Sequence, residues 1–245
     1  DFDIFRYEEN SITRFPVKSK INSSAVVYNS LIICDSENGA RFLNGDLFIQ
    51  LPNSEILKNK KICSILPLGK GKILFVSDLN GLFLFDGTNI TQYKTDIDQF
   101  LMENQVFCAS IYKNQLALGT VRNGLAVLNL SNNSKIFSNT FTGLQNNTVL
   151  SLSFDRTGNL WLGLDKGIDY VLINSPVYDL FGNSNIYGAG YASVTDKNLL
   201  YLGTNQGLYV TTYPVSTSVK PLQVNILHKI SGQVWNLKKI DKTIF

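Results

Sequence analysis

The chain has 245 residues, of which 44% are hydrophobic and 17% charged, and its formal net charge is +3. This composition indicates a folded globular protein and excludes a disordered chain. The apolar runs are too short to cross a membrane as a helix, the first residues lack the pattern of a signal peptide, and the scattered basic residues argue against nucleic-acid binding.

A glycine that follows a polar residue and precedes a short apolar run recurs along the chain. It stands at Gly39, Gly81, Gly124, Gly167 and Gly207, at intervals of 42, 43, 43 and 40 residues. Each glycine lies between two apolar runs, such as residues 160–163 and 168–171. This spacing predicts a β-hairpin in which the glycine supplies a positive φ.

Further apolar runs before and after each hairpin complete units of four strands. In chain order, residues 1–20 match the second half of such a unit, and 21–61, 62–104, 105–147, 148–185 and 186–231 are whole units. Residues 232–245 match the first half. Four strands in about 42 residues are the size of one blade of a β-propeller.

We therefore predict an all-β fold, a single β-propeller domain or a fragment of one, with four-stranded antiparallel blades. The runs are too short and too rich in aromatic and β-branched residues for a helical solenoid. The six blade equivalents allow two arrangements. Either the two halves pair and close a ring of six blades, or the chain is a window on a seven-bladed ring or a longer array, which the abrupt end at Phe245 favours.

One segment resembles a known repeat. Residues 143–152, followed by Asp155, Gly158, Leu160, Trp161, Gly163 and Gly167, are similar to the two-component regulator propeller repeat. Residues 201–208 look like a second copy of the latter half of this repeat, whereas the blades at Gly39, Gly81 and Gly124 share only its spacing and lack the tryptophan.

The resemblance implies a function. In that family, the propellers form the periplasmic sensor of Bacteroides-type regulators, which respond to oligosaccharides and signal as dimers. The output is a histidine kinase or a helix-turn-helix domain beyond a membrane helix. By this resemblance the chain is a sensor segment that contains no kinase. We expect a homodimer formed through the full-length protein, and membrane contact only through segments further downstream.

Residues for catalysis or metal binding are scarce. The chain has one histidine, His228, expected in a loop between blades, and three cysteines in apolar runs. A catalytic triad or a zinc site needs several such groups close together. Residues 153–161 approach the Asp-box of sialidases but are one residue too long. We expect no catalysis, no metal and no cofactor.

Sugars bind to aromatic rings flanked by planar polar groups, so exposed aromatic residues are the candidate ligand contacts. We select Tyr112, Tyr187, Tyr191 and Trp235, with Tyr187 and Tyr191 preferred because glycines surround them. The alternative for each is packing between blades. Two alternative functions also stay open: a propeller that binds another protein without a small ligand, and a propeller hydrolase or lyase.

Overall fold

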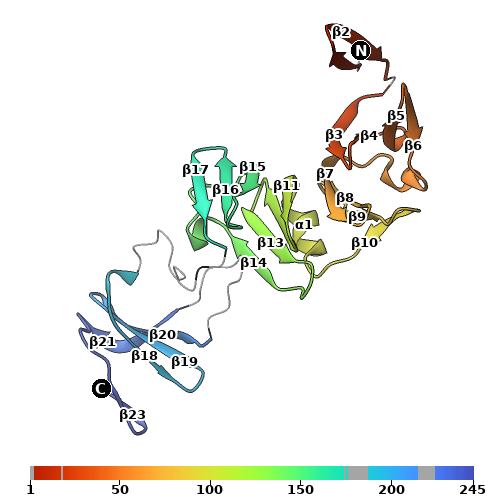
Figure 1. Ribbon diagram of the computed structural model, residues 1–245. Helices are drawn as coiled ribbons and strands as arrows, with labels where there is room; N and C mark the ends of the chain where they lie inside the picture. Colours follow the sequence, from red (N-terminus) through yellow and green to blue (C-terminus); the bar gives the residue numbers. More distant parts are fainter. Residues whose placement is uncertain (1–2, 18, 174, 176–186, 215–223) are drawn as a thin grey trace. The chain divides into compact units, whose positions relative to one another are not determined.

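The computed structural model describes residues 3–17, 19–173, 175, 187–214 and 224–245 (Figure 1). These residues form two compact units, Asp1–Lys135 with Asn146–Asn174, and Ile136–Gln145 with Ser175–Phe245. The first is called unit 1 and the second unit 2, and each is considered by itself. The predicted blade boundary at residues 185 and 186 lies outside the described residues.

Most strands form antiparallel sheets in which neighbours in sequence are neighbours in space. The first sheets are β1 (Ile4–Glu8) with β2 (Ser11–Phe15), and β3 (Ile21–Val27), β4 (Ser30–Asp35), β5 (Gly39–Asn44) and β6 (Leu47–Gln50). The next is β7 (Ile62–Gly69), β8 (Lys72–Ser77), β9 (Leu82–Phe85) and β10 (Ile90–Tyr93). It is followed by β11 (Val106–Tyr112), β12 (Gln115–Thr120), β13 (Leu125–Asn129) and β14 (Lys135–Ser138), and then by β15 (Val149–Phe154), β16 (Leu160–Leu164) and β17 (Ile168–Val171).

Unit 2 contains the remaining sheets. One consists of β18 (Gly190–Asp196), β19 (Leu199–Thr204), β20 (Gly207–Thr212) and β21 (Asn225–Ser231), and the other of β22 (Lys239–Ile240) and β23 (Thr243–Ile244). His228 therefore lies in strand β21 and not in the loop that the sequence predicts. The predicted all-β fold with four-stranded antiparallel sheets is confirmed.

Helices are short and lie between sheets. Those that lie within the described ranges are α1 (Asp98–Asn104) and the 3-10 turns η1 (Ser54–Leu57) and η2 (Thr140–Thr142). Within the described ranges, no helix has both the length and the apolar character that a membrane span requires.

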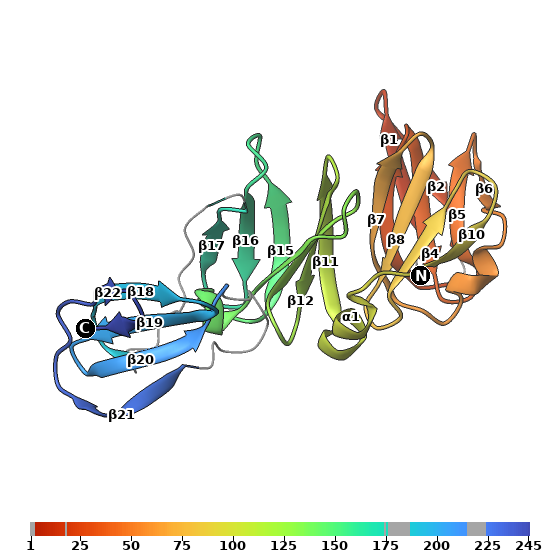
Figure 2. The ribbon, with the colours of Figure 1, turned by 90° about the horizontal axis from the view of Figure 1, so that it is seen from below.

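In unit 1 the first strand of each sheet packs against the first strand of the next. The pairs are β3 with β7, β7 with β11, and β11 with β15. Figure 2 shows β15, β16 and β17 succeeding one another across a single sheet, next to β11 and β12. The first strands thus lie side by side, and we call them the inner strands. This is how the blades of a propeller are arranged.

In three sheets of unit 1 the second strand carries much of the core. Ile33 in β4, Leu74 in β8 and Leu118 in β12 are fully buried. A strand that is covered on both faces needs apolar residues at successive positions and not in alternation. This explains why the sequence shows unbroken apolar runs at these strands.

The repeat glycines all have positive φ, from +73° at Gly124 to +154° at Gly207. At Gly39 a side chain is also excluded by space, because an added β-carbon would meet the carbonyl oxygen of Ser54. A hydroxyl residue three or four positions earlier holds each of three of these turns. The hydroxyls of Ser77, Thr120 and Thr204 accept a hydrogen bond from the amides of Asn80, Asn123 and Gln206, respectively.

Candidate functional site

A β-bulge recurs at the start of the inner strands. Register shifts follow the first residue of β3, β7, β11, β15 and β18, so one residue of each strand has no partner opposite. These bulged residues are Asn22, Cys63, Phe107, Leu150 and Tyr191, which are 41, 44, 43 and 41 positions apart. Because a bulge redirects a side chain out of the sheet, the bulged residues are candidates for contact with a ligand.

Trp235 occupies the same repeat position, although its segment is not a regular strand. A β-carbon added to Gly119 would lie 2.7 Å from Cγ1 of Val149, and one added to Gly203 would lie 2.7 Å from Cγ1 of Val234. Val234 therefore packs in unit 2 as Val149 does in unit 1. The residue after each valine is Leu150 or Trp235, so Trp235 corresponds to the bulged residue.

Tyr191 and Trp235 form an exposed aromatic stack. Their ring centroids are 4.3 Å apart and their planes differ by 2°. Trp235 is 65% exposed and Tyr191 39%. Each ring covers one face of the other, which leaves a flat outer face in contact with solvent.

Two further contacts hold the stack in place. The amide of Val234 donates a hydrogen bond to the carbonyl oxygen of Thr204 over 2.9 Å. Beyond the tryptophan, the ammonium of Lys239 contacts the carboxylate of Asp196 at the end of β18, at 2.6 Å. The hydrogen bond from Lys239 lowers the pKa of Asp196, so the carboxylate stays charged near neutral pH. Trp235 is thus fixed on both sides against the sheet that carries Tyr191.

The glycines near Tyr191 serve the hairpin of the same sheet. A β-carbon on Gly188 would collide with the side-chain oxygen of Asn205. The next amide, that of Ala189, donates to this oxygen, and the Asn205 amide donates to the carbonyl of Ala189. Close approach therefore explains Gly188, but the partner is the chain's own β19–β20 turn.

The other two predicted ligand residues lie elsewhere. Tyr187 packs edge to face on the buried Tyr209, with centroids 5.2 Å apart. Tyr112 stacks on Phe154, and its hydroxyl donates to the carbonyl oxygen of Arg156. The structure therefore brings Tyr191 together with Trp235, whereas Tyr187 and Tyr112 pack against other sheets or strands.

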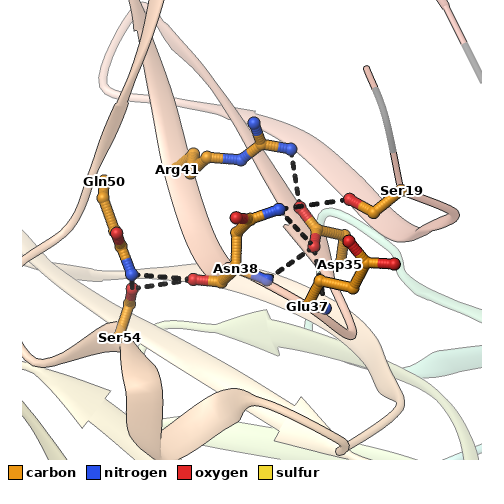
Figure 3. A network of polar contacts seen from close by, with 7 residues as sticks. All are labelled: Ser19, Asp35, Glu37, Asn38, Arg41, Gln50 and Ser54. Carbon is orange, nitrogen blue, oxygen red and sulfur yellow. Dashed lines mark hydrogen bonds and ion pairs between the residues drawn. The ribbon is translucent and has the colours of Figure 1, made fainter.

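Apart from the aromatic stack, a cluster of polar side chains lies at the β4–β5 turn of unit 1 (Figure 3). Asp35 stands where other sheets have Ser77, Thr120 or Thr204, and it is 1% exposed. One carboxylate oxygen accepts from the amides of Glu37 and Asn38 and from the Asn38 side chain. The other accepts from Arg41 Nη2 at 2.6 Å.

The chemistry of Asp35 is that of a structural anchor. Burial alone would raise the pKa of Asp35, but the bonds from Asn38, Ser19 and Arg41 outweigh it and hold the pKa below its ordinary value. Both carboxylate oxygens accept hydrogen bonds from neighbouring groups of the chain, so Asp35 holds the turn and the loop around Ser19 together. Nothing in the sequence singled out this cluster, because its members are dispersed between residues 19 and 54.

In the described part of the chain, groups that could bind a metal are dispersed. Among the described residues, no set of three or more histidine, cysteine or carboxylate side chains converges. A hollow in unit 1 has a volume of about 490 Å³ and lies between the β3–β6 and β7–β10 sheets. Its lining is largely apolar and includes Ile32, Phe42, Ile49 and Phe85.

A series of sheets whose inner strands pack side by side, as described above, defines the class of the protein as a β-propeller. Residues 143–166 match the family model described as "Two component regulator propeller". The family resemblance found in the sequence is thereby confirmed at this repeat. A search of curated proteins gives no match.

Solved structures show the same fold. The chain is similar to the extracellular domain of the putative hybrid two component system BT3049 from B. thetaiotaomicron, with 15% identity, a TM-score of 0.57, and coverage of 97% of this chain and 35% of that chain. Two structures of the extracellular domain of BT4673 from the same organism, described as part of a putative one component system and of a putative hybrid two component system, have TM-scores of 0.54 and 0.55. Their identities are 12% and 20%, with coverage of 98% and 97% of this chain and 36% and 34% of those chains. The chain thus spans about a third of the length of these structures.

Proposed function

We propose that this chain is part of the periplasmic sensor of a two-component-type regulator and that it binds an oligosaccharide. The matched repeat and the shared fold support the sensor role. The observation that carries the ligand class is the exposed stack of Tyr191 and Trp235.

The stack suits a sugar for physical reasons. A pyranose ring presents a face of C–H groups that packs on a flat aromatic surface, while its hydroxyls remain free for polar partners. Two coplanar rings offer a wider surface than one, and their rigidity lowers the conformational entropy lost on binding. An exposed pair of this kind otherwise leaves apolar area in water without a compensating contact.

The remaining parts of the proposal rest on the same likeness. They are the periplasmic location, a homodimer formed through the full-length protein, and an output through a histidine kinase that is anchored in the membrane. The segment itself acts by binding and not by catalysis.

Calorimetric titration of the chain with a panel of neutral, N-acetylated and acidic oligosaccharides tests the proposal. We expect at least one saturable binder, whose affinity falls roughly tenfold or more in Trp235→Ala, because the loss of a stacking aromatic removes an anchor. The matched control is Phe5→Ala in β1, which removes another exposed aromatic ring. No binding across the panel would refute the oligosaccharide class and favour a propeller that binds a protein, whereas turnover of a sugar would refute the non-catalytic role.

A further inference from the structure

Two bulged residues of unit 1 occupy the same position in the repeat as Tyr191 and Trp235, which form the aromatic stack of unit 2. Phe107 and Leu150 follow the buried Val106 and Val149 at the start of β11 and β15. They remain 44% and 39% exposed although both are large and apolar. Since β11 and β15 pack against each other, the two side chains stand on neighbouring inner strands.

Their setting differs from that of a residue that packs between blades. The residue before each bulge is fully or almost fully buried, at 1% for Val106 and 0% for Val149, whereas the bulged residue itself is only partly covered. The extra residue of a bulge rotates the side chain away from the sheet face. Phe107 and Leu150 are therefore only partly buried, and on neighbouring strands they leave apolar surface in contact with solvent.

The backbone around them is rigid. Gly119 lets Val149 approach β12 closely, and a β-carbon there would be 2.7 Å from both the Cys108 sulfur and Val149 Cγ1. The Cys108 thiol also points at the carbonyl oxygen of Val149, at 3.7 Å. The strands that carry Phe107 and Leu150 are thus fixed relative to each other before any ligand arrives.

We infer that the bulged residue of an inner strand is a ligand-contacting position, and that Phe107 and Leu150 of unit 1 form an apolar subsite for the C–H face of a sugar ring. This inference rests on the proposed function and names further specificity-determining residues for it. The occupant is an oligosaccharide because the equivalent residues of unit 2, Tyr191 and Trp235, form the flat surface that favours this class. Asn22, at the same position of β3, is polar and would bind hydroxyl groups, whereas the Cys63 thiol of β7 is directed at the carbonyl oxygen of Val76 in its own sheet.

The first test places one reporter at position 107 and another at position 235 of the chain. 4-Fluorophenylalanine is incorporated in place of Phe107 in one sample, and 5-fluorotryptophan in place of Trp235 in another. Both are titrated with the same oligosaccharide panel and observed by ¹⁹F NMR. A saturable shift at position 107 supports the subsite.

The two reporters separate the two proposals. A shift at position 235 with none at 107 overturns the subsite and leaves the oligosaccharide function standing. No shift at either position with any sugar overturns both. A shift at 107 alone supports the subsite and removes the aromatic stack from the binding surface.

Substitution gives a second readout. Phe107→Ala and Leu150→Ala should each weaken binding of the oligosaccharide that shifts the reporter, by roughly 3- to 10-fold. Phe5→Ala in β1 and Leu47→Ala in β6 remove comparable exposed side chains outside the bulge position and should leave the dissociation constant unchanged. Equal effects of bulge and control variants would overturn the inference.

Discussion

The hydroxyl of Tyr112 donates a hydrogen bond to the carbonyl oxygen of Arg156 over 3.0 Å, and this bond ties the β11–β12 hairpin to the β15–β16 hairpin of the next sheet. Tyr28 makes an equivalent link near the β3–β4 turn. Its hydroxyl accepts from the amide of Gly69 and donates to the carbonyl of Lys72. A tyrosine at the end of the first hairpin thus joins one blade to its successor at two places in unit 1.

Tyr112→Phe should lower the free energy of unfolding by about 0.5–1.5 kcal/mol, because it removes one hydrogen bond and leaves the ring contact with Phe154 in place. Urea unfolding followed by tryptophan fluorescence measures this change. Tyr7→Phe is the control, since the Tyr7 hydroxyl bonds only locally to Asn10 on an exposed hairpin. Its effect should stay within about 0.5 kcal/mol. An equal loss in both variants would argue against the link between blades.

Removing Arg41 should destabilise unit 1 strongly. Asp35 is fully buried and Arg41 mostly so, and the loss of one partner leaves an uncompensated charge. Arg41→Ala is expected to cost about 3 kcal/mol. In the double variant Asp35→Thr with Arg41→Leu, the threonine restores the hydroxyl found at the other turns, and the loss should be smaller than in Arg41→Ala.

The control for this pair is Lys94→Ala, which breaks an exposed ion pair with Asp98. Surface pairs contribute at most about 1 kcal/mol. Chemical denaturation of the wild type, Arg41→Ala, the double variant and Lys94→Ala measures their free energies of unfolding. If Arg41→Ala is no less stable than Lys94→Ala, the buried pair is not an anchor.

Acid should destabilise the chain below about pH 4, the ordinary pKa of aspartate in an unfolded chain. Hydrogen bonds to Thr157 and Tyr170 lower the pKa of Asp155, and bonds to Asn89 and Thr88 lower that of Asp86 to about 2. The pKa of Asp35 is lowered as well. At pH 3 the unfolded chain therefore binds more protons than the folded one, so stability is present above pH 4 and falls as the pH falls.

The denaturation midpoint measured from pH 6 down to pH 2 checks this sign. In Asp35→Asn the midpoint should be lower at neutral pH. It should also decline less on acidification, because one of the three carboxylates that titrate is gone. A wild-type midpoint that rises toward low pH would contradict the assignment.

Gly203→Ala should damage both stability and the aromatic stack. The new β-carbon would lie 2.7 Å from Cγ1 and 2.8 Å from the carbonyl oxygen of Val234, so the segment that carries Trp235 must shift. We expect a loss of about 1–3 kcal/mol and a change in the near-UV circular dichroism of the stacked rings. Gly190→Ala is the matched control, because nothing lies within 4 Å of its added β-carbon. If the two variants behave alike, Gly203 is not a close-approach position.

The thiols should be unreactive in the native chain. Desolvation by burial is the main cause that raises the pKa of Cys63 and of Cys108 to about 12 each, and it raises the pKa of Cys34 as well. Thiolates are therefore rare at pH 8. A disulfide reagent should label the chain slowly until urea is added, after which all three cysteines react. Fast labelling of a single native thiol would contradict this expectation.

The repeat was predictable because it is local. A glycine such as Gly167 between two short apolar runs is enough to predict a hairpin. All the residues of one repeat lie within about 42 positions of sequence. The stack of Tyr191 and Trp235 was predictable only in part. The sequence identifies both residues as candidates but does not predict that they stack. The stacking depends on a bulge, which is a feature of the register between strands and not of the residue types.

The Asp35 cluster was hidden for a different reason. Ser19, Asp35 and Arg41 belong to a loop and two strands, and only the folded turn brings them together. Tyr112 illustrates packing that the sequence does not specify. An aromatic residue next to polar neighbours predicts an exposed contact, yet packing against the following sheet takes up the ring and its hydroxyl.

The recurring bulge has an evolutionary consequence. The residue it displays is set apart from the apolar second strand on which folding depends, so it can mutate at little energetic cost. Gene duplication supplies copies of such a blade, and each copy is then free to acquire its own side chain at this one place. A chain of this design can change its preferred molecule by single substitutions, one blade at a time, while the scaffold stays intact.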